Sequence, residues 1–293
     1  LTLFVGAPGS ITNTGRVVNL SVLAPVSASN PIIAGFVISG SGSQSILIRA
    51  VGPGLSAVGV NDGLAAPNLK VFNAATAVIH ESNSWGGSST LSAEFARLGA
   101  FPLNAASADA AVSLSLAPGA YTLHVNASGT TSGTALAEVY DASISPAPAG
   151  TPRLVNISAR GVVGSAGQLV TGGFVITGTT PRKMLIRGIG PGLTGQGVTG
   201  ALSDPVVTLH KIGTGVIAQN DNWGTPLTVV SSYPAATPGE ISAAATTTGA
   251  FSLAAGSSDG AILVTLAPGI YTAQVGGAGT ATGAAMVEVY EVP

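Results

Sequence analysis

The sequence predicts an all-β protein made of two tandem β-sandwich domains, jelly-roll or immunoglobulin-like, with an extra strand at the N-terminus. Two observations lead to this prediction. The chain of 293 residues contains one module twice. Each copy is a series of short stretches rich in Val, Ile, Tyr and Phe, separated by Gly, Pro, Asn or Asp, which is the pattern of strands joined by tight turns. Six or more strands of this length per copy suit a sandwich.

The internal repeat sets the domain boundaries. Phrases of the first copy return in the same order in the second: "GFVISG" as "GFVITG", "LIRAVGPGL" as "LIRGIGPGL", "VIHESNSWG" as "VIAQNDNWG", "LAPGAYT" as "LAPGIYT" and "TSGTALAEVYD" as "ATGAAMVEVYE". We therefore assign 16–141 to the first module and 153–293 to the second. Residues 1–15 form an N-terminal extension, and the Pro-, Ala- and Ser-rich stretch 142–152 is the predicted linker.

Helical spacing is rare in this sequence. Only "TLSAEFARLGAF" at 90–101 places Leu91, Phe95 and Leu98 on one helical face. The second copy contains about 12 additional residues between its Trp and Phe251, which we interpret as a loop insertion.

The chain is poor in charge. Charged residues make up 8% and the formal net charge is −2, against roughly 25% charged residues in a typical soluble domain. We expect no nucleic-acid partner, because such proteins carry a clustered basic face. We also expect no membrane span, because no apolar run approaches the roughly 20 residues that one requires. So little surface charge predicts that other copies of the chain cover much of the surface.

The repeated "GPGL" phrase resembles a dinucleotide-binding loop, but its context argues against that interpretation. A phosphate would need the N-terminus of a helix after the glycines, and the following residues are rich in Gly and Pro without an amphipathic face. We interpret both phrases as structural corners where a buried strand turns. The corner residues are Gly52, Pro53, Gly54, Gly190, Pro191 and Gly192.

The sequence contains no set of residues typical of catalysis, and we expect neither an enzyme nor a cofactor. The histidines at His80, His124 and His210 fall at non-equivalent places in the two copies, and none has another at metal-ligand spacing. "NDNW" at 220–223 could form a calcium loop, but its twin "SNSW" lacks the carboxylate. An Asx-turn before a buried Trp is the preferred interpretation, and no metal site is predicted.

Few ionic residues occur in both copies, and buried ones need partners. We predict that Arg49 pairs with Glu138 or Asp109, and that the equivalent arginine of the second copy pairs with the twin of one of these acids. The second set is Arg187, Glu288 and Asp259.

Trp85 and Trp223 also recur at equivalent positions, and we predict that they fill the cores of the two sandwiches. The alternative is that they lie on the surface and stack against sugars.

The N-terminus begins with an apolar stretch that is predicted to be an assembly strand, consisting of Leu1, Thr2, Leu3, Phe4 and Val5. It stands where a preceding module would place its final strand, and the residues after it share the composition of the linker. We predict that it docks on an open sheet edge of another copy, because strand addition satisfies backbone groups without charge. Head-to-tail contacts that do not close generate filaments. The alternative is that it pairs within its own module. A start at Leu1 without a leader suggests a mature or trimmed product.

The set "LIRAVGPGL … NSWG … LAPGAYT … TSGTALAEVYD" resembles a tandem repeat module of large secreted and cell-surface proteins of environmental bacteria. The resemblance covers nearly the whole chain twice, except for residues 1–15 and the linker. It implies a β-rich protein located outside the cell or at the cell surface, and it supplies no catalytic residue.

These observations together predict a structural, self-assembling extracellular protein, the subunit of a filament or surface layer whose partners are copies of itself. The alternative is a carbohydrate-binding or adhesion module with surface polysaccharide as its partner. An aromatic content of 5% weighs against an extended sugar-binding platform.

Overall fold

The computed structural model describes residues 15–143, 152–165, 168–225 and 233–293. Within them, two antiparallel sheets of eight strands each stack into a sandwich. The first repeat supplies β1 (Arg16–Ser27), β2 (Ile32–Ser39), β3 (Gln44–Val51), β4 (Pro67–Asn73), β5 (Val78–Ser82), β6 (Ala110–Leu116), β7 (Gly119–Ala127) and β8 (Ser132–Asp141). The second repeat supplies β9 (Arg153–Val163), β10 (Val170–Thr177), β11 (Arg182–Ile189), β12 (Pro205–Lys211), β13 (Gly215–Asn220), β14 (Gly260–Leu266), β15 (Gly269–Gly277) and β16 (Gly283–Val292). The helices are α1 (Ser89–Leu98) and α2 (Pro238–Thr248), with short 3-10 helices η1 (Pro53–Val58) and η2 (Pro191–Gln196).

Each repeat is a jelly roll. The first repeat contributes the order β1-β8-β3-β6 to one sheet and β2-β7-β4-β5 to the other, and the second repeats this order with β9 to β16. Successive strands within a repeat alternate between the sheets, except that β4 pairs with β5 and β12 with β13, which is the strand order of a jelly roll. The predicted all-β architecture with two sandwiches is confirmed, and of the two sandwich types expected the structure has the jelly roll.

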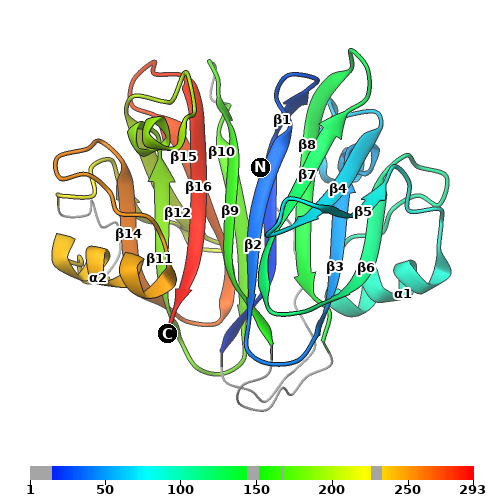
Figure 1. Cartoon of the computed structure of the whole chain (residues 1–293), viewed down its shortest axis with the longest axis horizontal. Coiled ribbons are helices and arrows are strands. Elements are labelled where there is room, and N and C mark those ends of the chain that lie inside the picture. Colours follow the sequence, from blue (N-terminus) through cyan, green and yellow to red (C-terminus); the bar gives the residue numbers. More distant parts are fainter. Residues whose placement is uncertain (1–14, 144–151, 166–167, 226–232) are drawn as a thin grey trace.

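The two repeats share both of their sheets, a feature that the sequence did not reveal. β1 pairs with β10, placing Leu20 opposite Phe174, and β2 pairs with β9, placing Phe36 opposite Ile157. Each sheet therefore runs through both repeats, which lie side by side with α1 and α2 at opposite ends (Figure 1). Most of the predicted linker, residues 144–151, lies outside the described residues.

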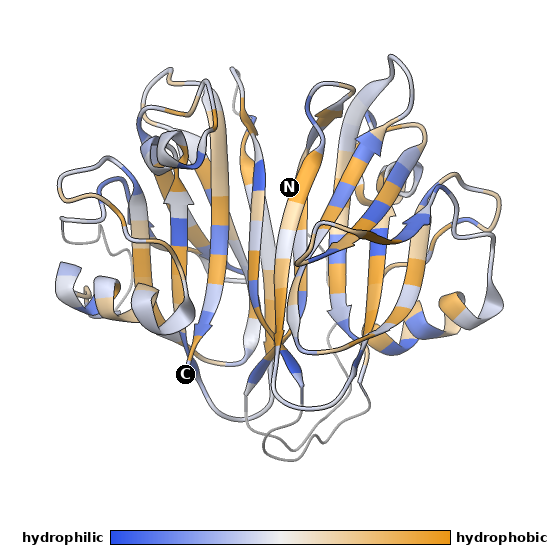
Figure 2. Ribbon diagram, viewed as in Figure 1, coloured by the Kyte–Doolittle hydropathy of each residue, from blue (hydrophilic) through white to orange (hydrophobic). Residues whose placement is uncertain are grey.

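One apolar core fills the space between the sheets and continues through both repeats. Apolar and polar residues alternate along the strands, visible as orange and blue bands (Figure 2), because successive side chains point to opposite faces. Phe36 stacks on Tyr121 with ring centroids 5.4 Å apart, and Phe174 stacks on Tyr271 at 5.3 Å. Each of these stacks lies within one repeat, and both belong to the core cluster that includes residues of both repeats.

Each helix covers part of an outer sheet face. The expected helix at 90–101 is α1, which buries Phe95 and is capped by Ser88, whose side chain accepts a hydrogen bond from the amide of Leu91. The Ser cap satisfies one of the free amides of the first turn.

The second repeat also has a helix, α2, which we did not expect from the sequence. It is the counterpart of α1 and lies outside the insertion, because α1 and α2 both end just before a Gly-Ala-Phe sequence. It begins with a capping box between Thr237 and Glu240 and buries Ile241 against the outer face of the second repeat. The "TPGE" signature was present in the sequence as a signal for this helix.

Candidate functional site: buried clusters, the interrepeat groove and the outer margins

Arg49 and Glu138 form a buried ion pair on the outer face of the first repeat. The Nε atom of Arg49 lies 2.9 Å from Oε2 of Glu138. The guanidinium also donates a hydrogen bond of 2.8 Å to the carbonyl of Phe101 and lies over the rings of Phe95 and Phe101, at 4.7 and 4.6 Å from their centroids. The hydroxyl of Tyr140 donates to Oε1 of Glu138 at 2.7 Å. Both charged side chains are fully buried, so the cluster holds the helical layer to the sheet and offers no surface to a ligand.

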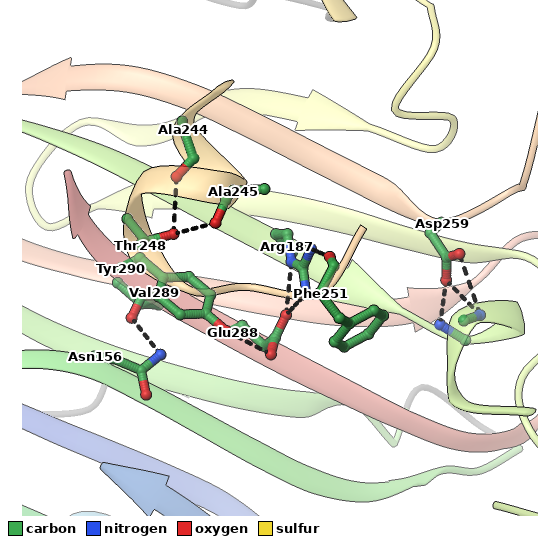
Figure 3. Close-up of polar contacts among 12 residues, drawn as sticks. Asn156, Arg187, Ala244, Ala245, Thr248, Phe251, Asp259, Glu288, Val289 and Tyr290 are labelled. Atoms are coloured by element: carbon green, nitrogen blue, oxygen red, sulfur yellow. Dashed lines mark hydrogen bonds and ion pairs between the residues drawn. The ribbon is translucent and has the colours of Figure 1, made fainter. Parts of the chain in front are cut away.

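The second repeat builds the same cluster (Figure 3). Nε of Arg187 lies 2.6 Å from Oε2 of Glu288, and its Nη1 atom donates to the carbonyl of Phe251 at 2.5 Å. The guanidinium lies 4.4 Å from the centroid of the Phe251 ring. The hydroxyl of Tyr290 donates to Oε1 of Glu288 at 2.8 Å. Burial raises the pKa of the Tyr290 phenol, and the nearby Glu288 carboxylate raises it further. The tyrosine therefore stays a hydrogen-bond donor to the carboxylate.

Asp109 is not the partner of Arg49. Its carboxylate instead accepts hydrogen bonds from the backbone amide of Gly52 at 2.8 Å and from that of Gly54 at 3.1 Å. Gly52 is required by close packing, because a Cβ atom there would lie 2.0 Å from the carbonyl oxygen of Leu64. Asp109, a buried acid that directly precedes β6, thus fixes the first glycine corner.

Asp259 plays the same part in the second repeat. It accepts from the amides of Gly190 at 2.8 Å and Gly192 at 3.2 Å. A short 3-10 helix does begin at Pro53 and at Pro191, where we expected none. Even so, the amides that a phosphate would require are occupied by a carboxylate of the chain itself. This arrangement supports a structural role for both "GPGL" phrases.

The two tryptophans lie outside the core between the sheets, which corrects our prediction. Trp85 packs with Phe95 in a separate cluster under α1, and Trp223 packs with Ile241 in the equivalent cluster under α2. Their exposed fractions are 5% and 8%, and their indole N–H groups donate to the backbone, that of Trp223 to the carbonyl of Ala254 at 3.0 Å. Neither ring presents a face on which a sugar could stack.

A second set of ion pairs lies at the junction of the two repeats, close to the start of the described chain. Arg16 lies 3.5 Å from Asp141, and Glu291 pairs with Arg153 at 3.2 Å and with Arg182 at 3.6 Å. These residues recur in both copies, apart from Arg182, whose counterpart is a glutamine. The pairing joins the start of the first strand of each repeat to the end of its last.

Gly15 is tied to the second repeat. Its amide donates to the Thr180 hydroxyl at 2.7 Å, and its carbonyl accepts from Arg182. Residues 1–14, including the predicted assembly strand from Leu1 to Val5, lie outside the described residues. The described chain therefore starts at the junction of the repeats, beside the connection between β10 and β11.

The outer margins of the two repeats differ although their strands are equivalent. We call β5 and β6 with their side chains the β5–β6 margin, and the corresponding strands of the second repeat the β13–β14 margin. In the β5–β6 margin Val78 and Ile79 are 50% and 40% exposed, and Val112 and Leu114 are half-buried. The equivalent of Ile79 in the other margin, Ile217, is only 2% exposed.

The β13–β14 margin is covered by its own insertion. Tyr233 packs against the core between the sheets, Ala236 packs against the cluster under α2, and residues 233–236 line one hollow together with Leu263 and Val264 of β14. Val264 is 5% exposed, whereas its equivalent Leu114 in β6 is half-buried. The first repeat lacks the insertion, and no described residue covers β6 in the same way.

A groove of about 390 Å³ lies on the outer face of one sheet where the two repeats join. Its walls include Ile33 and Thr122 from the first repeat and Ser158, Arg160 and Met286 from the second. Arg160 makes no ion pair with any residue that the structure describes. Both repeats contribute side chains to this groove, which makes it a candidate ligand site.

The described residues show no group of three or more acidic, histidine or cysteine side chains that could hold a metal ion. His124 and His210 lie on strands, and burial lowers the pKa of each imidazole. None of the helices in the described ranges is both long and apolar enough to cross a membrane.

No family model matches the chain, and no curated protein does. Among solved structures, it is similar to a DUF4785 family protein from Legionella pneumophila, at 9% identity and a TM-score of 0.24, over 95% of this chain and 84% of that one. It is also similar to a fucolectin from striped bass serum, at 9% identity and a TM-score of 0.20, over 95% and 85% of the two chains. Because these identities and TM-scores are so low, we base no argument about fold or function on them.

Proposed function

We propose that this protein is a structural subunit that assembles outside the cell or at its surface into a filament or layer, with head-to-tail contacts through its N-terminal strand. The observation that carries the proposal is the β5–β6 margin. It combines two sheet edges with the exposed side chains of Val78 and Ile79, whereas the equivalent margin of the same chain is covered. Exposed edges are normally blunted by charge, prolines or covering segments, because they pair readily with other chains.

The shape and the composition of the chain support the same role. Two sheets that run unbroken through both repeats make a stiff body of sixteen strands within the described residues, suited to bear load along a polymer. With 8% charged residues, the chain keeps little of the surface charge that holds proteins apart. A strand donated by one copy to the next is a heterologous contact, which propagates when it does not close.

The test is negative-stain microscopy of the full chain beside a variant that lacks residues 1–10. We expect filaments or sheets from the full chain and dispersed particles from the truncated one. A second variant, Leu3→Asp with Phe4→Asp, keeps the length of the chain and removes only the apolar character of the segment. Thr2→Ser is its conservative control. Dispersed particles from every sample at high protein concentration would exclude the proposed function. Assemblies from every sample would support the structural role but show that the N-terminal strand does not mediate assembly.

A second candidate function is binding of surface polysaccharide, and the groove between the repeats favours it. Its volume of about 390 Å³ suits a small ligand, and polar side chains such as Ser158, Thr122 and Arg160 line it beside apolar ones. The buried tryptophans do not contribute to such a site. Isothermal titration with acidic and neutral polysaccharides, on the full chain and on Arg160→Ala, tests this function independently of assembly. Binding that Arg160→Ala weakens would support it, and the absence of binding to any polysaccharide would remove it.

A further inference from the structure

We infer that the β5–β6 margin of the first repeat is the acceptor for residues 1–5 of a second copy, and that the incoming segment does there what residues 233–236 do within the second repeat. This inference rests on the proposed function and adds the acceptor site to it.

The second repeat provides the precedent. Tyr233 packs an aromatic side chain against the core at the outer margin, and the residues after it line one hollow with residues of β14. With this cover, Ile262 and Val264 of β14 are 0% and 5% exposed, and Ile217 of β13 is 2% exposed. The margin of this fold therefore accepts an apolar segment with an aromatic residue.

The first repeat has the same site without the segment. Val112 and Leu114 of β6, the equivalents of Ile262 and Val264, are half-buried. Ile79 of β5, the equivalent of Ile217, is 40% exposed. The difference follows from length, since the first repeat is about 12 residues shorter between its Trp and Phe101. Repeats of equivalent fold should bury equivalent side chains, and the margin of the first repeat lacks the means to do so among the described residues.

The N-terminal stretch has the chemistry that the margin requires. "LTLFV" has no charged side chain, has residues that favour strands, and offers Phe4 as the counterpart of Tyr233. A strand added to the edge of β6 would pair its free backbone groups, and its apolar side chains would cover Val112 and Leu114. Apolar area removed from water would stabilise the contact.

The repeat pattern indicates that the acceptor is another copy. The stretch that precedes Arg153 includes the end of β8, which belongs to the sandwich of the preceding repeat and not to the repeat that it leads into. By analogy, we expect the stretch that precedes Arg16 to dock on a repeat other than its own. The margin of the second repeat is already covered, which leaves the first repeat of a neighbouring copy.

Cysteine cross-linking tests the contact directly, because the chain contains no cysteine. One set of donor chains carries a single cysteine at each of positions 1–5 in turn. The acceptor chain lacks residues 1–10 and carries Ser115→Cys, and the matched control acceptor carries Thr265→Cys. Ser115 in β6 and Thr265 in β14 are equivalent exposed positions, so neither change disturbs a core. Donor and acceptor are mixed with oxidised glutathione and separated on a non-reducing gel.

We expect at least one donor position to form a mixed disulfide with Ser115→Cys in about tenfold higher yield than with Thr265→Cys, because docking raises the effective concentration of the paired thiols. Equal yields with both acceptors, or no mixed disulfide although the full chain forms assemblies, would overturn the acceptor site and leave the proposed function standing. A chain with both Phe4→Cys and Ser115→Cys that closes on itself at high dilution would show docking within one copy, which also overturns the inference. If the full chain does not assemble at all, the proposed function itself fails.

A second pair of variants checks the same site by assembly alone. Ser115→Lys places a charge on the β6 edge and should abolish filaments, whereas Thr265→Lys on the covered edge should leave them intact. Thermal unfolding of both variants verifies that each still folds. Filaments from Ser115→Lys at the yield of the unmodified chain would contradict the inference.

Discussion

The Oε2 atom of Glu138 lies 2.9 Å from the Nε atom of Arg49, with both side chains shielded from water beneath the α1 layer. Replacing one member of such a pair leaves the other charge buried without its partner. We therefore expect Glu138→Gln to lower the free energy of unfolding by about 3–5 kcal/mol, measured by urea denaturation. The double variant Arg49→Met with Glu138→Gln should recover part of this loss, because no uncompensated charge remains.

The control is the exposed pair of Lys70 and Glu81, whose atoms lie 3.2 Å apart at the surface. Glu81→Gln should leave the urea midpoint almost unchanged, because water screens such pairs. If Glu138→Gln were as harmless as Glu81→Gln, the ion pair would not contribute to folding in the way that its burial implies.

The sharing of sheets between the repeats predicts that they unfold together. Pairing of β1 with β10 and of β2 with β9, with one core across both, leaves no boundary at which one repeat could melt alone. Glu138→Gln and Glu288→Gln should each shift a single calorimetric transition by a similar amount, although they lie in different repeats. A transition that splits in two in either variant would show that the repeats are independent.

The strand content could be predicted from the sequence because it depends on local alternation, and the internal repeat was visible by self-similarity. The pairing of Arg49 with an acid was also predictable, since few charges recur in both copies. The sequence could not predict that this acid is Glu138 and not Asp109, because the pairing depends on which face of β8 lies beneath α1. For the same reason Trp85 was predicted in the wrong layer: its pattern signals burial but does not say on which side of the sheet.

The joining of the repeats was the largest feature that the sequence did not predict. The residues of a strand edge do not show which strand will pair with it. The sequence therefore could not distinguish two separate sandwiches from the observed pairing of β1 with β10, which sets Leu20 opposite Phe174, and of β2 with β9, which sets Phe36 opposite Ile157. The helix α2 was missed for a different reason. Its capping residues Thr237 and Glu240 were visible, but most of its residues are Ala, Ser and Thr, which give no clear apolar face at helical spacing.

The glycine corner gives a sharp mutational test. A methyl group on Gly52 would lie 2.0 Å from the carbonyl oxygen of Leu64, so the backbone must move and disturb the bonds to Asp109. We expect Gly52→Ala to lower the free energy of unfolding by about 3 kcal/mol, at the upper end of the range for overpacking. Gly195→Ala in η2 is the control, because a Cβ atom there meets nothing within 4 Å. It should be neutral or slightly stabilising. Equal effects of the two changes in urea denaturation would contradict a steric role for Gly52.

Three buried tyrosines predict a loss of stability at alkaline pH. Burial raises the pKa of Tyr271 to about 12, and burial together with a neighbouring glutamate raises the pKa of Tyr140 and of Tyr290 above the ordinary value of 10. Each phenol binds its proton more tightly in the folded chain than in the unfolded one. Its contribution is therefore fully present below pH 10 and is lost as the pH rises from 10 towards 12. Urea denaturation at pH 8, 10 and 11.5 should show this decline. Tyr271→Phe removes one of the three groups and should make the decline shallower while costing about 1 kcal/mol at pH 8 through the lost bond to the carbonyl of Ala267. A decline of the same steepness in this variant would mean that ionisation of Tyr271 is not coupled to unfolding.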